Sequence, residues 1–277
     1  MDYSPNKMNQ FLNNNSFNFK KKFGQNFIVD ENIIDKIVDS ASIDQDTMVI
    51  EIGPGAGSLT YKLAQKAKQV LCYEIDTTLD GILKETLKDY DNVDITFDDF
   101  LKRNVVEDLK KYEYKKLYVV ANLPYYITTP IITKIIEDEI PVDKVVIMVQ
   151  KEVGDRFKAE VGTKDYNSLT IYLNHYFDIK KVMVVSKNVF IPKPRIDSMV
   201  LEFNKKKKRE DIKNPSLFFK LVRDSFTQKR KTLRNNLKGY DLDKIEEVLK
   251  KYNMDLSVRA EQISSDIFID IANSLEE

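Results

Sequence analysis

The sequence predicts an α/β fold in which a Rossmann-like, mainly parallel sheet carries an antiparallel hairpin at its edge and a small all-α domain follows. Short apolar, β-branched runs alternate with amphipathic helical segments through the first half of the chain, which is typical of a parallel sheet. Two later strands are joined by a proline-containing loop without a helix, which indicates the antiparallel hairpin. Beyond a charged connector at residues 204–213, only helical patterns remain.

Composition limits the possible chemistry of this chain of 277 residues. Its single cysteine, Cys72, and single histidine, His175, exclude a disulfide framework and a Cys/His metal cluster, so we expect no metal. The apolar runs are shorter than a membrane span requires, and residues 1–19 are rich in Asn without the apolar region of a secretion signal. We therefore expect a cytoplasmic protein that does not contact a membrane, with its first 19 residues disordered. We also expect it to be a monomer.

Charge is balanced overall but is unevenly distributed. Residues 205–238 hold thirteen Lys or Arg against three acidic residues, whereas residues 239–277 hold four against ten. A basic block followed by an acidic tail favours nucleic acid as a partner of one face. The block contains Lys229, Arg230, Lys231 and Arg234, whose density suits phosphate contacts, although a solvated helix face is the alternative.

The first three predicted strands each end in residues suited to a ligand. The strand at residues 48–52 leads into a turn with Gly53 and Gly55, where the backbone can approach a ligand closely, and then into a helix over 59–66. The second strand, 69–75, carries Glu74 near its end, a position that commonly accepts hydrogen bonds from ribose hydroxyls. The third, 93–97, precedes Asp98 and Asp99, and an acid there could meet the amine of an adenine.

The fourth strand, at residues 117–120, leads into a polar and aromatic turn. There Asn122 offers an amide that can donate and accept, Pro124 stiffens the backbone, and Tyr125 offers a ring for stacking. A loop with a helix cap explains these residues equally well when they are taken alone. An adenosine-containing ligand lying across the sheet explains all four strand ends together.

The remaining elements follow from the same periodicities. A helix preceded by Asp30 is expected over 31–40, a fifth strand over 144–149, a charged helix over 150–156 and a further helix over 168–177. The edge strands are predicted at 181–185 and 198–203, around a loop that holds Phe190 rigidly. Four helices are expected in the C-terminal domain, over 216–226, 228–237, 242–252 and 265–275. We expect domain boundaries at 1–19, 20–204 and 205–277.

Three motifs in this order resemble the ribosomal RNA adenine dimethyltransferase family, and within it the small-subunit branch. They are Glu-x-Gly-x-Gly-x-Gly at residues 51–57, Asn-Leu-Pro-Tyr at 122–125 and Phe-x-Pro-x-Pro-x-Ile-Asp-Ser at 190–198. The resemblance runs from Phe23 to Glu261. The glycine motif alone is shared by many methyltransferases, whereas the second and third motifs in sequence are far more specific.

The resemblance implies a class I methyltransferase that uses S-adenosylmethionine as methyl donor. It implies two methyl groups on the exocyclic amine of each of two adjacent adenosines in the 3′-terminal hairpin loop of 16S rRNA, during ribosome biogenesis. The residues carried over for the donor are Asn26, Ile28, Gly53, Gly55, Glu74, Asp99 and Asn122. Those carried over for catalysis are Asn122, Leu123, Pro124, Tyr125 and Phe190.

In this interpretation the Asn122 side chain and the Leu123 carbonyl accept from the target amine, while Tyr125 and Phe190 stack on the flipped base. The alternatives are a large-subunit (23S) rRNA adenine methyltransferase that confers macrolide resistance, and an RNA-binding assembly factor whose catalysis is secondary. A nicotinamide-dependent dehydrogenase is disfavoured, because the glycine spacing differs from Gly-x-Gly-x-x-Gly.

Overall fold

The computed structural model describes residues 10, 19–20, 23–207 and 211–276, and the predicted disorder of the N-terminal tail lies almost wholly outside these residues. The chain divides into two compact units, residues 1–154 with 179–205 and residues 155–178 with 206–277. We assigned residues 155–178 to the methyltransferase domain, whereas this division groups them with the C-terminal helices. No helix among the described residues is both long and apolar enough to span a membrane.

The first unit is built on a seven-stranded mixed sheet. In spatial order its strands are β4 (Val93–Thr96), β3 (Gln69–Tyr73), β2 (Thr47–Ile52), β5 (Lys116–Asn122), β6 (Lys144–Gln150), β9 (Ser198–Lys205) and β7 (Phe177–Val185). The five strands from β4 to β6 are parallel, and β9 joins β6 antiparallel. The order of strands reverses between β2 and β5, and ligands of open α/β sheets bind at the carboxyl ends of strands at such a switch point.

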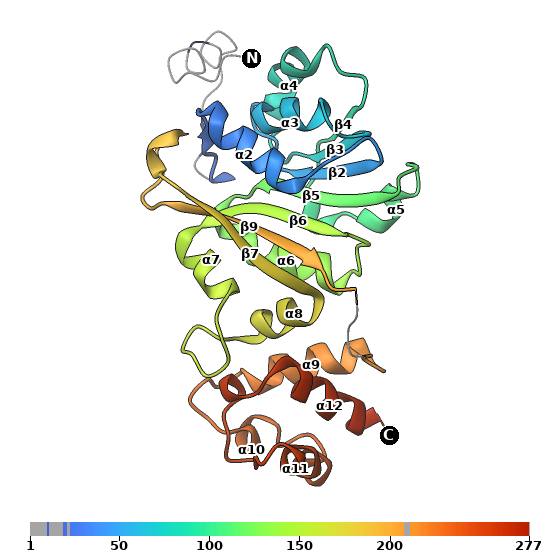
Figure 1. Ribbon diagram of the computed structural model, residues 1–277, viewed down its shortest axis with the longest axis vertical. Helices are drawn as coiled ribbons and strands as arrows, with labels where there is room; N and C mark the ends of the chain where they lie inside the picture. The colour runs from blue at the N-terminus through green and yellow to red at the C-terminus, as the bar shows by residue number, and fades with distance from the viewer. Residues whose placement is uncertain (1–9, 11–18, 21–22, 208–210, 277) are drawn as a thin grey trace. The chain divides into compact units, whose positions relative to one another are not determined.

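Both faces of the central strands are buried, as a parallel sheet requires. On one face, helices α2 (Glu31–Ala41) and α3 (Ser58–Ala64) cover apolar residues of β2, β5 and β6 (Figure 1). Ile34 and Ile37 of α2 are in this cluster, and Asp30 caps the helix by accepting from the Asn32 N–H at 3.0 Å. The alternate residues of the same strands, such as Val119 and Ile147, are also fully buried.

The other helices and short elements complete the two units. Those of residues 75–150 are η2 (Thr77–Leu79), α4 (Asp80–Leu87), η3 (Phe100–Lys102), α5 (Val105–Leu109), η4 (Tyr125–Ile127) and α6 (Thr128–Glu137). They are followed by α7 (Lys151–Phe157), α8 (Ser168–Tyr176), η5 (Lys187–Val189), α9 (Pro215–Ser225), α10 (Leu233–Asn236), α11 (Leu242–Lys251), η6 (Ala260–Gln262) and α12 (Ser265–Glu276). A separate two-residue pair joins β1 (Phe27–Ile28) to β8 (Phe190–Ile191) antiparallel.

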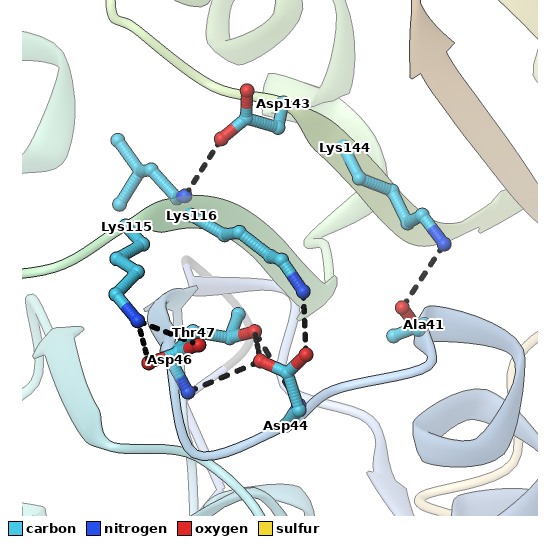
Figure 2. A network of polar contacts seen from close by, with 9 residues as sticks. Ala41, Asp44, Asp46, Thr47, Lys115, Lys116, Asp143 and Lys144 are labelled. Atoms are coloured by element: carbon cyan, nitrogen blue, oxygen red, sulfur yellow. Dashed lines mark hydrogen bonds and ion pairs between the residues drawn. The ribbon is translucent and has the colours of Figure 1, made fainter.

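Charged side chains tie together the amino ends of the central strands, which are the ends away from the ligand-binding carboxyl ends. The Asp143 carboxylate accepts from the Leu117 N–H at 2.9 Å, and the Lys144 ammonium donates to the Ala41 carbonyl at 3.0 Å, which joins α2 to β6. Figure 2 shows this network, which also contains Asp44, Asp46, Thr47, Lys115 and Lys116. These contacts fix the amino ends of the strands and leave their carboxyl ends for a ligand.

Two expectations about secondary structure were wrong. The helix expected over 228–237 is only the four residues of α10, because residues 226–230 form turns and the Leu233 and Arg234 N–H groups donate to the loop at 256–258. Phe190 and Ile191, which we predicted in a loop, form β8. The predicted edge hairpin is present as neighbouring strands β7 and β9, with β9 on the inside next to β6.

Candidate active site

A cleft of about 670 Å³, which includes open solvent, lies at the carboxyl ends of β2, β3 and β5. Nine predicted site residues line it: Asn26, Ile28, Gly53, Gly55, Glu74, Asn122, Leu123, Pro124 and Tyr125. Residues that we did not assign to the site line it too, among them Phe23, Gln25, Phe27, Glu51, Ser58 and Leu59. The structure thus brings residues from four separate segments of the chain to one place.

The glycine turn after β2 forms the floor of the cleft. Gly53 and Gly55 have φ of +72° and +58°, a region in which a side chain is strained. A Cβ on Gly55 would lie 2.7 Å from Cε1 of Phe27, and one on Gly53 would lie 3.8 Å from Cδ of Pro124. The absence of a side chain at Gly55 therefore lets β1 approach the floor, whereas a Cβ on Gly53 would be in ordinary van der Waals contact with Pro124.

Glu74 follows β3 and is 5 % exposed. One carboxylate oxygen accepts from the Gly55 N–H at 3.1 Å, and the other accepts from the Asp76 N–H at 2.8 Å. Burial raises the pKa of Glu74, and the two backbone hydrogen bonds act in the opposite direction. A carboxylate can accept about four hydrogen bonds, so Glu74 keeps acceptor capacity for ligand hydroxyls.

A second carboxyl, Glu51, lies on the same cleft and is 2 % exposed. Burial raises the pKa of Glu51 to about 8, and the nearby Glu74 charge contributes to this increase. Two carboxyl groups with raised pKa values thus share one buried site, and the pKa of Glu51 favours its protonated form at neutral pH.

The Asn122 side chain has a fixed orientation at the end of β5. Its Nδ2 donates to the Asn26 carbonyl oxygen at 3.0 Å. The Oδ1 atom of the amide is therefore the acceptor that Asn122 can offer to a ligand. The next residue, Leu123, is anchored through its N–H to the Met148 carbonyl at 3.2 Å, and no hydrogen bond within the described part of the chain uses the Leu123 carbonyl oxygen.

Tyr125 is held by a buried partner from the third motif. Its hydroxyl lies 2.6 Å from Oγ of Ser198, the fully buried first residue of β9. Burial raises the pKa of Tyr125, so the hydroxyl stays neutral. The hydrogen bond restricts rotation of the side chain and fixes the plane of the ring at the cleft.

Asp99 does not line the cleft but lies beside it. Its carboxylate caps η3 by accepting from the Leu101 N–H at 3.0 Å, whereas Asp98 pairs with Arg103 at 3.4 Å. Burial raises the pKa of Tyr126, and the charges of Asp99 and Glu74 add to this effect. An adenine contact for Asp99 stays a prediction.

Phe190 is placed differently from our expectation. It is 3 % exposed and belongs to the apolar cluster that includes Ile28, because β8 pairs with β1 through Ile28 and Phe190. Its ring is not part of the cleft lining in this structure. Stacking of Phe190 on a base requires its ring to leave this cluster, so that role stays a prediction.

The basic residues of the predicted RNA-binding segment belong to the second unit. Lys229, Arg230, Lys231 and Arg234 are all exposed. Leu233 is fully buried beneath them, which orients this segment with its cations toward solvent. The Lys229 ammonium donates to the Lys164 carbonyl, and Arg234 lies 3.9 Å from Glu246.

Some residues of the cleft had signals in the sequence that we did not use. Glu51 is the first residue of the glycine motif, and Gln25 and Phe27 flank the predicted Asn26. A buried acid next to a glycine turn could have been singled out from the motif itself. The contact of Phe27 with Gly55 could not have been found in this way. It depends on the pairing of β1 with β8, two strands that lie about 160 residues apart in the sequence.

Comparisons with known proteins agree on one family. The sequence model described as "Ribosomal RNA adenine dimethylase" matches residues 16–277. A protein of Staphylococcus aureus named "Ribosomal RNA small subunit methyltransferase A" is 47 % identical over 243 residues, which are 87 % of this chain and 82 % of that protein. The crystal structure of a dimethyladenosine transferase from Plasmodium falciparum superposes with a TM-score of 0.73 at 27 % identity, covering 87 % of this chain and 94 % of the other. The 23S rRNA methyltransferase ErmE shares the fold, with a TM-score of 0.66 at 24 % identity and coverage of 91 % and 100 %.

The glycine turn yields a first prediction. Replacing Gly55 with Ala puts a side chain at positive φ and against the Phe27 ring, so we expect a loss of about 1–2 kcal/mol in the free energy of unfolding. Gly81→Ala is the matched control, because Gly81 lies in α4 with nothing within 4 Å of its added Cβ. That change should stabilise the protein by about 0.5–1 kcal/mol. Denaturant unfolding measures both, and equal effects would contradict the assigned geometry.

The buried Glu51 carboxyl yields a second prediction. Between the ordinary Glu pKa of 4.5 and about 8, the folded protein holds a proton on Glu51 that the unfolded chain has lost, so this contribution to stability falls as pH rises. Glu51→Gln removes the titration. Its stability relative to the native protein should therefore increase with pH, by up to about 1.4 kcal/mol for each pH unit between the two pKa values. Denaturant unfolding from about pH 5 to about pH 9 tests this, with the exposed Glu85→Gln as control. A constant difference between Glu51→Gln and native protein would refute it.

Proposed function

Because the chain belongs to the ribosomal RNA adenine dimethylase family, we propose that it dimethylates the exocyclic amines of two adjacent adenosines in the 3′-terminal hairpin loop of 16S rRNA. The observation that carries the proposal is the fixed Asn122 amide at the end of β5, beside the glycine turn and Glu74 in one cleft. S-adenosylmethionine is the methyl donor that the family implies. In this proposal the substrate RNA is part of the small ribosomal subunit or of its precursor.

The residues of the cleft fit this donor. Gly53 and Gly55 line the cleft and adopt positive φ values that glycine tolerates, so the backbone of this turn can lie against a ligand. Glu74 has acceptor capacity for the two hydroxyls of a ribose, and Asp99 follows the next strand, where an adenine amine could donate to it. Asn26 and Ile28 border the same cleft from the N-terminal segment. When bound, the donor would supply a methyl group on a sulfonium sulfur, which leaves as a neutral thioether when the methyl group is transferred.

The chain's own residues would position the acceptor amine. An adenine amine is a poor nucleophile because its lone pair is delocalised into the ring. Oδ1 of Asn122 and the carbonyl oxygen of Leu123 can accept from its two N–H groups, which favours a pyramidal nitrogen with its lone pair available. Because Nδ2 of Asn122 already donates a hydrogen bond to the Asn26 carbonyl, Oδ1 is held in place before the base binds, and little reorganisation is needed during the reaction.

The base itself would be held by stacking. Tyr125, fixed through Ser198, offers a ring for a flipped adenine, and stacking of this kind contributes about 1–3 kcal/mol per base. The methyl transfer requires neither a covalent intermediate with the protein nor a strong side-chain general base. Positioning and electrostatics supply the catalysis.

The basic segment of the second unit supports a polymer substrate. Its exposed cations Lys229, Arg230, Lys231 and Arg234 can contact phosphates, which hold RNA without reading its sequence. The 47 % identity to a protein named for the small subunit favours small-subunit over large-subunit RNA. The likeness to ErmE concerns the fold alone.

Methyl transfer to purified small subunits that lack the modification tests the function. We expect N6,N6-dimethyladenosine at both adjacent positions, detected by mass spectrometry of the 3′-terminal RNA fragment, and none on free large-subunit rRNA. Transfer only to the large-subunit RNA would overturn the assignment.

Asn122→Ala separates chemistry from binding in the same assay. Loss of the amide acceptor should lower the rate of methyl transfer by about 10²–10³-fold, as removal of one preorganised group at a reacting centre does. Binding of small subunits should be retained. A rate within a few-fold of native would contradict the role of Asn122, and RNA binding without transfer by the native protein would favour an assembly factor.

A further inference from the structure

Asp76 is a nearly fully buried acid that lies behind the cleft rather than in its lining. It follows Glu74 by two residues and is 1 % exposed. Its carboxylate accepts from Nζ of Lys20 at 2.6 Å and from Nε2 of Gln25 at 2.8 Å. It also accepts from the N–H and the hydroxyl of Thr78, at 3.1 and 2.6 Å. A buried carboxylate is tolerated only where such partners compensate the loss of water.

Two of these partners connect Asp76 to the N-terminal wall of the cleft. Residues 23–28, here called the N-terminal strap, all line the cleft. Gln25 is the centre of the contact, because its Oε1 accepts from the Lys20 N–H at 2.8 Å while its Nε2 donates to Asp76. The other end of the strap is held by the short pairing of β1 with β8, by the hydrogen bond from the Val29 N–H to the Val189 carbonyl, and by the one from Nδ2 of Asn122 to the Asn26 carbonyl.

Asp76 is also connected to the floor of the cleft. Its own N–H donates to one oxygen of Glu74, whose other oxygen accepts from the Gly55 N–H. A continuous series of hydrogen bonds therefore runs from Lys20 and Gln25 through Asp76 and Glu74 to the glycine turn. Burial would raise the pKa of Asp76, but the bonds from Lys20, Thr78 and Gln25 outweigh burial and hold it below its usual value, so the group is charged at neutral pH.

We propose that Asp76 is a positioning residue for the methyl donor, holding the N-terminal strap and the Glu74 carboxylate in the arrangement that the donor requires. This inference rests on the proposed function, since it concerns the donor of that reaction. Asp76 touches no ligand in this role. It acts by keeping two walls of the cleft, which are far apart in sequence, in one polar network before the donor arrives.

The alternative to this proposal is that Asp76 has only a local structural role. Asp76 is also the N-cap of η2, through its bond to the Thr78 N–H. Asn caps helices about as well as Asp does, so Asp76→Asn keeps the cap. The substitution removes the charge that Lys20 pairs with, and it replaces the oxygen that accepts from Gln25 by an N–H₂ group, which cannot accept a hydrogen bond.

The test measures donor affinity and strap order in the full-length protein. Isothermal titration with S-adenosylmethionine and with S-adenosylhomocysteine gives the dissociation constants. Hydrogen exchange reports the protection of residues 23–28. Asp80→Asn is the matched control, because Asp80 is a nearby acid that is 44 % exposed and pairs with Lys84 on the surface of α4. Lys20→Met is a second variant that leaves Asp76, its cap and the core intact.

For Asp76→Asn we expect a dissociation constant for both ligands at least about tenfold higher than native, since a charge-assisted network is broken. Lys20→Met should weaken binding in the same direction by a smaller factor, and both variants should lose protection in the strap. Asp80→Asn should stay within about twofold of native. If Asp76→Asn does not fold, Lys20→Met alone decides.

Native-like donor affinity and strap protection in Lys20→Met and in any folded Asp76→Asn would overturn the proposal while leaving the proposed function intact. Faster exchange of the strap with unchanged donor affinity would also overturn it, because the network would then be structural only. A native protein that binds neither ligand would overturn the proposed function and this inference together.

Discussion

The position of the Glu74 carboxylate is the constraint on which the cleft depends. Two backbone N–H groups, from Gly55 and Asp76, hold it at the end of β3, so the glycine turn and the next turn of the chain are fixed relative to each other. The fixed turn allows Phe27 to pack against Gly55, where a side chain is missing. Burial of this carboxyl group is tolerated because both of its oxygens accept hydrogen bonds. A polar interaction thus organises the walls around it.

The sheet supplies the rigid frame for this arrangement. Its parallel strands are buried on both faces, and charged groups such as Asp143 and Lys144 tie their amino ends together. The carboxyl ends then present Gly53, Glu74 and Asn122 at the switch point between β2 and β5. The fixed amide of Asn122 and the fixed ring of Tyr125 follow the same principle. Functional side chains are held by hydrogen bonds to neighbouring segments rather than by their own element alone.

Much of this could be predicted from sequence because the relevant signals are local. Strand runs, the glycine turn and the acid after β3 all lie within short windows. Helices α2 and α3 and the parallel strands β2 to β6 match their predicted ranges to within a few residues. What could not be predicted depends on contacts between distant segments. The β1–β8 pair buries Phe190, the Ser198 hydroxyl fixes Tyr125, and loop bonds shorten the helix around Leu233. None of these has a periodicity that a sequence window could reveal.

The most direct test of the donor site is an experimental structure of the protein with S-adenosylhomocysteine. We predict the ribose hydroxyls within hydrogen-bonding distance of the Glu74 carboxylate, with the ligand lying over Gly53 and Gly55 and reaching toward Asn122. Asp99 should lie at the adenine end. Density for the ligand at another place on the sheet, or a ribose that does not contact Glu74, would contradict this assignment of the cleft.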